Sequence, residues 1–187
     1  MLEPGELVIS ELRGDQEGDD SFGHYIELYN AAARSVDLQG VRVRARGASG
    51  DVIEFFVRDE LEIPAGAHVV LGPGVPDEPA MWIDYAVGWD ITNSPDPDKY
   101  PRTLLAEASG IIEVESCGEL IDEVVYAGLP SAGTFACGSV DAPPDALAND
   151  DTNTGCWCVD AAEADPDFPL FGLGLPGTPG RANRCAP

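Results

Sequence analysis

The chain has 187 residues, 44% apolar and 24% charged, a length and composition typical of a single well-packed domain. Acidic residues outnumber basic ones by 34 to 10, which gives a formal charge of −24. Such a field repels phosphate backbones, so we expect no nucleic-acid partner, and the sequence has no apolar run of about 18 residues that would make a transmembrane segment.

Short β-branched blocks separated by turn signals follow one another along the chain, and none of them has the length and period of a three-turn amphipathic helix. Proline and glycine lie between several of the blocks, as in the turn at residues 63–66 (IPAG). The pattern predicts an all-β fold, an antiparallel sandwich or barrel. The expected strands are residues 6–12, 24–30, 52–57, 67–71, 111–115 and 119–126, with a further short strand inside residues 81–89.

One more stretch, residues 36–46, changes its alternation in the middle. Apolar residues fall on even numbers before Gly40 and on odd numbers after it. A strand keeps one buried face across such a change only through a bulge or a bend, and glycine tolerates either. We therefore predict a bulge or a bend at Gly40.

The second half of that stretch carries Arg42, Arg44 and Arg46 at period 2, so the three arginines share the face opposite the apolar residues. One interpretation pairs them with acids on a neighbouring strand, such as Glu54. The other makes them an interaction edge that recognises anions or the acidic face of another copy.

The five cysteines are Cys117, Cys137, Cys156, Cys158 and Cys185, and four of them lie in the loop-rich last part of the chain. Paired CxxC or histidine spacings of a zinc site are missing there, so we favour disulfides, each typically worth about 2–4 kcal/mol. Disulfides imply export, which predicts a secreted, cell-surface or periplasmic protein. The first residues lack the layout of a signal peptide, so we expect a leader to have been removed.

An odd number of cysteines leaves one thiol over. Cys117 lies at the tip of a predicted hairpin, which makes it a candidate for an intermolecular bridge. Alternatively Cys117 pairs internally and Cys185 is the spare, because sequence alone does not assign connectivity.

Five separated segments carry a pattern that extends from one end of the chain to the other. They are residues 6–12 with Ile9 and Glu11, residues 25–41 (YIELYN and then VDLQGV), residues 61–71 (LEIPAGAHVVL), residues 109–126 with Asp122 and Tyr126, and residues 177–183 (GTPGRAN). In content and order these segments resemble the lamin-tail domain family, an immunoglobulin-like β-sandwich found in nuclear lamins and in many secreted bacterial proteins. Val41 departs from the family, which usually has tryptophan after the glycine that corresponds to Gly40.

The resemblance implies a single lamin-tail-like sandwich over residues 1–187. Its core would comprise about residues 5–128 and the closing segment 170–184, with loop insertions at residues 72–103 and 129–169. Within this fold, Asn30 and Asp37 stand beside turns and suit backbone N–H bonds there, and Asn183 would bond locally to pin the tail.

Catalytic signatures are missing from the sequence. His24 and His68 fall on predicted strands, and no serine lies in a G-x-S-x-G elbow. The glycine pattern at residues 172–177 matches G-x-G-x-x-G only superficially, because it opens no helix. We therefore expect no catalytic residues and no enzymatic activity.

Clustered oxygen side chains do occur at residues 149–155 (NDDTNTG), where Asp150, Asp151 and Asn153 would be the ligands of a Ca²⁺ ion. Residues 15–20 form a weaker second candidate. The alternative for both is a solvated turn, so the cofactor prediction is none, or else calcium.

Two functional hypotheses follow. The first is a non-enzymatic exported structural or interaction module, used for surface attachment or as an assembly scaffold, whose partner is another protein or a second copy in a homo-oligomer. The second is a calcium-dependent carbohydrate- or polymer-binding accessory domain. Its stacking platforms would be Trp82, Trp89 and Trp157, which could equally pack under the long loops.

Overall fold

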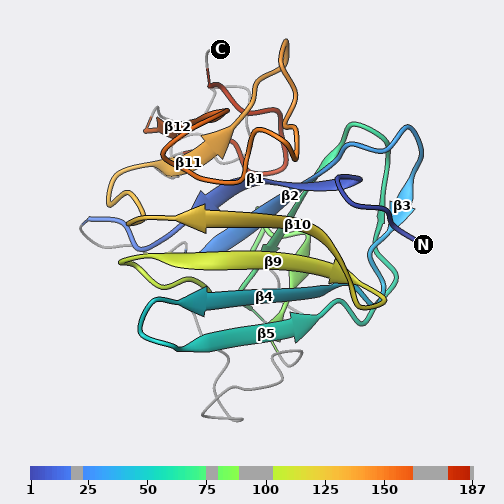
Figure 1. The fold of residues 1–187 in the computed structure, drawn as a ribbon, viewed down its shortest axis with the longest axis horizontal. Helices are drawn as coiled ribbons and strands as arrows, with labels where there is room; N and C mark the ends of the chain where they lie inside the picture. The colour runs from blue at the N-terminus through green and yellow to red at the C-terminus, as the bar shows by residue number, and fades with distance from the viewer. Residues whose placement is uncertain (18–22, 75–79, 89–102, 162–176, 186–187) are drawn as a thin grey trace.

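The computed structural model describes residues 1–17, 23–74, 80–88, 103–161 and 177–185, and within them the fold is all-β (Figure 1). The described residues form no helix, and so none that could cross a membrane. The strands are β1 (Leu7–Arg13), β2 (Tyr25–Asn30), β3 (Val36–Asp37), β4 (Arg42–Gly47), β5 (Val52–Phe56), β6 (Glu62–Ile63), β7 (His68–Gly72), β8 (Tyr85–Ala86), β9 (Gly110–Ser116), β10 (Glu119–Tyr126), β11 (Thr134–Cys137) and β12 (Trp157–Asp160).

Three sheets contain these strands. Six strands form one sheet in the order β12-β11-β1-β2-β7-β8, four form a second in the order β10-β9-β4-β5, and β3 pairs with β6. All neighbouring strands are antiparallel except β7 and β8. Figure 1 shows the four-stranded sheet across the middle of the molecule, with β11 and β12 beyond β1 at the top. The predicted all-β class is confirmed.

One hydrophobic core receives side chains from both larger sheets. In β4, Val43 and Ala45 are buried, while Arg42, Arg44 and Arg46 are half-exposed or exposed, as the period of two predicts. Burying each aliphatic side chain contributes about 1.5–3 kcal/mol. The core includes Leu7, Ile9, Leu12, Ile26, Leu28, Val69 and Leu71 from the six-stranded sheet and Val43, Phe55, Ile112, Val114 and Val124 from the four-stranded sheet.

The predicted break at Gly40 is a bend. Gly40 has φ +85°, the left-handed region that favours glycine. The amide of Val41 donates to the carbonyl of Leu38, which closes a tight turn. The chain thereby leaves β3 in the two-stranded sheet and enters β4 in the four-stranded one, so both apolar sets stay buried.

The expectation that residues 129–169 form a loop insertion is wrong in part. Two strands of four residues each, β11 and β12, lie in this stretch and extend the six-stranded sheet. Four residues show too little alternation to be recognised as a strand from sequence. Strands this short are held in place by pairing with their neighbours. In the other predicted insertion, residues 72–103, the short strand expected inside 81–89 is β8, whereas residues 75–79 and 89–102 lie outside the described ones.

The closing segment is not a strand where the structure describes it. Residues 177–183 run as turns and extended chain across β1 and β11, while residues 170–176 lie outside the described part. Asn30 and Asp37 bond backbone N–H groups beside their turns, as predicted: Asn30 Oδ1 accepts from Ala32, and Asp37 Oδ1 accepts from Gln39.

Candidate functional site

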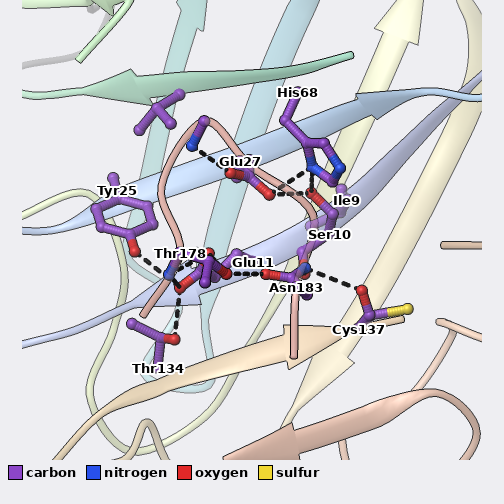
Figure 2. Close-up of polar contacts among 12 residues, drawn as sticks. Ile9, Ser10, Glu11, Tyr25, Glu27, His68, Thr134, Cys137, Thr178 and Asn183 are labelled. Carbon is purple, nitrogen blue, oxygen red and sulfur yellow. Dashed lines mark hydrogen bonds and ion pairs between the residues drawn. The ribbon is translucent and has the colours of Figure 1, made fainter. Parts of the chain in front are cut away.

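A cluster of buried polar side chains lies where the closing segment crosses β1 and β2 (Figure 2). At its centre are two carboxylates, Glu11 on β1 and Glu27 on β2, and both are fully buried. Ionisable side chains this deep require hydrogen-bond partners, since an unpaired polar group in an apolar interior costs several kcal/mol. We call this cluster the clasp; its members are Ser10, Glu11, Tyr25, Glu27, His68, Thr134, Gly177, Thr178, Gly180 and Asn183.

Glu11 collects donors from three parts of the chain. Its Oε1 accepts from the Tyr25 hydroxyl at 2.8 Å, from the Thr134 hydroxyl at 2.5 Å and from the Thr178 amide at 3.2 Å. These bonds join β1 to β2, to β11 and to the closing segment. The carboxyl of Glu11 therefore fixes four elements at one point.

The hydrogen-bond inventory around Glu11 accounts for a bound proton. Thr178 Oγ1 lies 3.4 Å from Glu11 Oε2 and 2.7 Å from Asn183 Oδ1. A hydroxyl has one proton, and the shorter bond to Asn183 uses it, so among the described residues Glu11 Oε2 has no donor nearer than 3.4 Å and has room for a proton of its own. Burial, reinforced by the nearby Glu27 carboxylate, raises the pKa of Glu11 from 4.5 to about 8.

Glu27 binds the other end of the closing segment. Its Oε2 accepts from the Gly180 amide at 2.7 Å, and its Oε1 accepts from the Ser10 hydroxyl at 2.6 Å. The same Oε1 lies 2.8 Å from Nδ1 of His68, a side chain only 5% exposed. His68, at the start of β7, is thus a buried partner of a carboxylate and has no access to a substrate.

Asn183 makes the local bond that the sequence predicts, with Thr178, and two long-range bonds that the sequence did not indicate. Its Nδ2 donates to the Ser10 carbonyl at 2.8 Å and to the Cys137 carbonyl at 2.9 Å, so the amide bridges β1 and β11. Its Oδ1 accepts the Thr178 hydroxyl. The Nδ2 group of this buried side chain thus attaches the tail to strands that are 46 and 173 residues away along the chain, while Oδ1 holds the tail's own turn.

A third buried carboxyl, Asp122 on β10, holds the next stretch of β1. Its Oδ2 accepts from the Ile9 amide at 2.7 Å and from Asn149 Nδ2, also at 2.7 Å. Asn149 in turn donates to the Ile9 carbonyl at 3.1 Å. Burial raises the pKa of Asp122 from 3.8 to about 7.

One group in the described residues has the composition of a metal site. Ligand atoms of Asp15, His24 and Glu107 lie within 4.8 Å of one another. His24 Nε2 is 2.9 Å from Asp15 Oδ1 and 3.2 Å from Glu107 Oε1. However, His24 Nδ1 accepts the Leu105 amide at 3.2 Å, so the proton of the neutral ring sits on Nε2.

That tautomer does not fit a metal. A ligating histidine offers an unprotonated nitrogen to the ion and usually donates a hydrogen bond from its other nitrogen. If Nε2 of His24 bound an ion, Nδ1 would have to donate, but Nδ1 faces the Leu105 amide, which is itself a donor. Nε2–H instead bonds the two carboxylates. His24 is therefore a buried connector between the chain before β2 and the loop at residue 107.

The predicted calcium ligands lie in a loop that follows the edge of β10. The Asp150 carbonyl accepts the Val125 amide, and the Thr152 amide donates to the Val125 carbonyl. Asp151 Oδ1 accepts both the backbone and the side-chain N–H groups of Asn153, and these bonds lower the pKa of Asp151. Calcium binding at Asp150, Asp151 and Asn153 stays a prediction, as does the site at residues 15–20, part of which lies outside the described ones.

Arg42, Arg44 and Arg46 on β4, which we call the arginine stripe, have glutamates on both neighbouring strands. Glu54 is one of these glutamates, as the pairing interpretation expects. The strand register places Arg44 directly opposite Glu54 on β5 and Glu113 on β9. Exposed pairs of this kind contribute about 0–1 kcal/mol each. The ion pairs are Arg42 with Glu115 and with Glu54 (3.6 Å), Arg44 with Glu54 (2.9 Å), Glu113 (3.7 Å) and Glu115 (3.8 Å), and Arg46 with Glu113 (2.9 Å).

Four cysteines form disulfides, Cys137 with Cys156 and Cys158 with Cys185, which indicates an oxidising, extracytoplasmic environment. The second bond links β12 to the chain just after the clasp. Cys117 is free and exposed, so including it among the disulfide cysteines is wrong for the single chain, and so is the alternative with Cys185 as the spare. It lies at the tip of the β9–β10 hairpin, as predicted.

The tryptophans that the structure describes are packed. Trp82 contacts a small second core around Tyr25 and Ile83, and Trp157 packs on the main core and donates Nε1–H to the Asn149 carbonyl at 2.8 Å. Trp89 lies outside the described residues. For Trp82 and Trp157 these contacts agree with packing under the loops.

Comparison of the sequence with known protein families and with curated proteins finds no match.

Proposed function

We propose that this protein is a non-enzymatic, exported structural or interaction module with an immunoglobulin-like β-sandwich of the lamin-tail type. Its role is surface attachment or the assembly of other proteins around a rigid scaffold. The clasp supports this proposal, because Glu11, Glu27 and residues 177–183 belong to segments that resemble the family. Segments that are far apart in the sequence, and that each resemble the family, thus contact one another in the clasp.

The observation that carries the proposal is that the most deeply buried polar side chains bond other segments of the same chain. Glu11, Glu27 and Asn183 are at most 2% exposed, and their bonds run from one chain segment to another. A catalytic carboxylate needs contact with a substrate, and these have none. The groups stabilise the scaffold and leave binding to the surface.

The two disulfides support export to the cell surface, the periplasm or the medium. Both lie after β10, where the described strands have only four residues each and cross-links add stability to loop-rich chain. A durable scaffold outside the cell is the role this arrangement serves best.

The test uses producing cells, fractionated and then treated with a zero-length carboxyl-to-amine cross-linker. This reagent suits a chain with 34 acidic residues, which can couple to lysines of a partner. We expect the protein in an extracytoplasmic fraction, oxidised at four cysteines and cross-linked to another protein or to itself. A monomeric protein with reduced cysteines in the cytosol would refute the proposal.

The melting temperature of the purified protein, measured with and without EDTA, distinguishes the calcium-dependent alternative from the scaffold function. A bound ion stabilises the folded state by mass action, so a fall in Tm in EDTA would favour that alternative. An unchanged Tm supports the scaffold.

A further inference from the structure

A cleft of about 1020 Å³ opens on the surface beside β10. Most of its lining comes from three segments: β10, the chain before β1, which we call the first wall, and the loop at residues 143–147, which we call the second wall. Its lining includes Pro4, Gly5, Leu120, Glu123, Val125, Ala146 and Leu147.

The lining of the cleft includes apolar side chains that are exposed to solvent. Leu147 is 92% exposed, Leu120 45% and Val125 40%, and they lie in one lining together with two prolines of the loop wall. Single exposed apolar residues are common, but several around one concave surface indicate an interaction site.

The charged residues of the cleft have a single sign. Besides the buried Asp122, the lining contains Glu123, Asp145 and Asp150 and no basic residue. In the described part of the chain, none of Glu123, Asp145 and Asp150 makes an ion pair, unlike the glutamates around the arginine stripe. A cationic side chain entering the cleft would therefore meet uncompensated negative charge.

The walls are fixed before anything binds. The Gly5 amide donates to the Ile121 carbonyl at 2.8 Å, and the Val125 amide donates to the Asp150 carbonyl at 2.8 Å. The bond between Cys137 and Cys156 closes the loop that carries the second wall. A preformed cleft lowers the ordering cost of binding.

We propose that this cleft binds a segment of a partner protein in which lysine or arginine lies next to apolar side chains. The inference rests on the proposed function and assigns the surface through which the scaffold holds its partner. Apolar contacts with Leu147, Leu120 and Val125 would give affinity, while Glu123 and Asp150 would select the positive charge.

Charge favours a different protein over a second copy. Arg34, Arg42, Arg46 and Arg184 are engaged in ion pairs within the chain, and two chains of charge −24 repel each other. A carbohydrate is disfavoured because sugars stack on aromatic rings, and the lining offers one aromatic side chain, Tyr29.

The test measures binding of three labelled octapeptides to the purified, oxidised protein by fluorescence anisotropy. The probes alternate leucine with lysine, serine with lysine, and leucine with glutamate. We expect the leucine–lysine peptide to bind about tenfold or more tightly than either control peptide. Backbone amide NMR shifts on titration should concentrate at the cleft residues of β10 and at residues 145–147.

Two pairs of variants distinguish binding in the cleft from long-range electrostatic attraction to the acidic surface. Leu147→Asp is matched by Val140→Asp, which is 77% exposed and outside the lining, and Glu123→Lys is matched by Glu119→Lys on the same strand. Leu147→Asp adds negative charge, so a loss of about tenfold for the basic peptide can come only from the lost apolar contact. Thermal melts establish that each variant folds.

Equal binding of the serine–lysine and leucine–lysine peptides, or equal loss in the matched variants, would overturn the inference and leave only long-range attraction. Cross-links in cells that map to another face would also overturn it, although the proposed scaffold function would then stand. Absence of any cross-linked partner would count against the function itself.

Discussion

The protonated Glu11 at the centre of the clasp predicts how stability depends on pH. The folded state raises the pKa of this carboxyl from 4.5 to about 8, so the folded protein binds the proton more tightly than the unfolded chain does. Its contribution is fully present below about pH 4.5 and is lost as the pH rises through about 8. The protein is therefore expected to be most stable in mild acid and to weaken toward pH 9.

The size of the effect follows from the shift. A difference of about 3.5 pKa units corresponds to about 5 kcal/mol between the two limits, at about 1.4 kcal/mol per unit. Asp122 acts in the same direction, because its pKa rises from 3.8 to about 7. Most of the loss should fall between pH 5 and pH 9, on the order of several kcal/mol.

The variant Glu11→Gln isolates the first carboxyl. A glutamine keeps an acceptor for Tyr25 and Thr134, and its amide N–H can donate to the Thr178 hydroxyl, which is the arrangement inferred for the protonated acid. We expect the variant to match the wild type within about 1 kcal/mol at pH 5 and to be more stable at pH 9.

The assay is urea unfolding with both disulfides intact, measured from pH 5 to pH 9. Glu119→Gln, an exposed site on β10, is the matched control for removing one charge from a chain of −24. The reasoning fails if stability rises from pH 5 to pH 8, or if Glu11→Gln is destabilised by the same amount at every pH. Either result would mean that the buried carboxyl is ionised.

Three further predictions concern the closing segment and are measured by thermal and urea unfolding. Gly177→Ala should cost more than about 2 kcal/mol, because a Cβ there would lie 2.2 Å from Glu11 Oε1 in a left-handed conformation; Gly180→Ala, with open space at its Cβ, should cost clearly less. Asn183→Ala leaves two buried carbonyls without donors and should cost about 2–4 kcal/mol, whereas a change under 0.5 kcal/mol would contradict the described bonds. Cys185→Ser opens a cross-link spanning 27 residues and should cost about 3–4 kcal/mol; an unchanged midpoint would show that the bond is not formed.

Local patterns were sufficient to predict much of the fold. Alternation over a few residues determines which side of a strand is buried, so the opposed faces of Val43 and Arg44 could be read from their neighbours alone. The hairpin at Cys117 was equally local, since two residues with positive φ connect β9 and β10 directly.

The clasp could not be predicted in the same way, because its members are far apart in the chain. Thr178 meets Glu11 across 167 residues, and Gly180 meets Glu27 across 153. The usable signal was Glu11, a charged residue inside the apolar block at residues 6–12, in which every position from Leu7 onward is buried. A carboxylate in such a strand must have buried partners, although sequence does not name them.

The tautomer of His24 was also beyond reach of the sequence. Its neighbours along the chain suggest only a strand-end histidine, while the decisive contact is the Leu105 amide, 81 residues away. One backbone donor distinguishes a buried connector from a metal ligand here. No spacing rule carries that information.

The polar residues of the clasp and Asp122 share one structural task. β1 pairs with β11 only through Glu11 and Leu12, so on that side the amide and carbonyl of Ile9 and the carbonyl of Ser10 have no neighbouring strand. Side chains take its place: Asp122 accepts from Ile9, and Asn149 and Asn183 donate to the two carbonyls. An open strand edge recruits other chains, whereas this one is closed by residues from three distant segments. The partner segment that we propose would therefore have to bind elsewhere, and the acidic, apolar cleft beside β10 is the surface to test first.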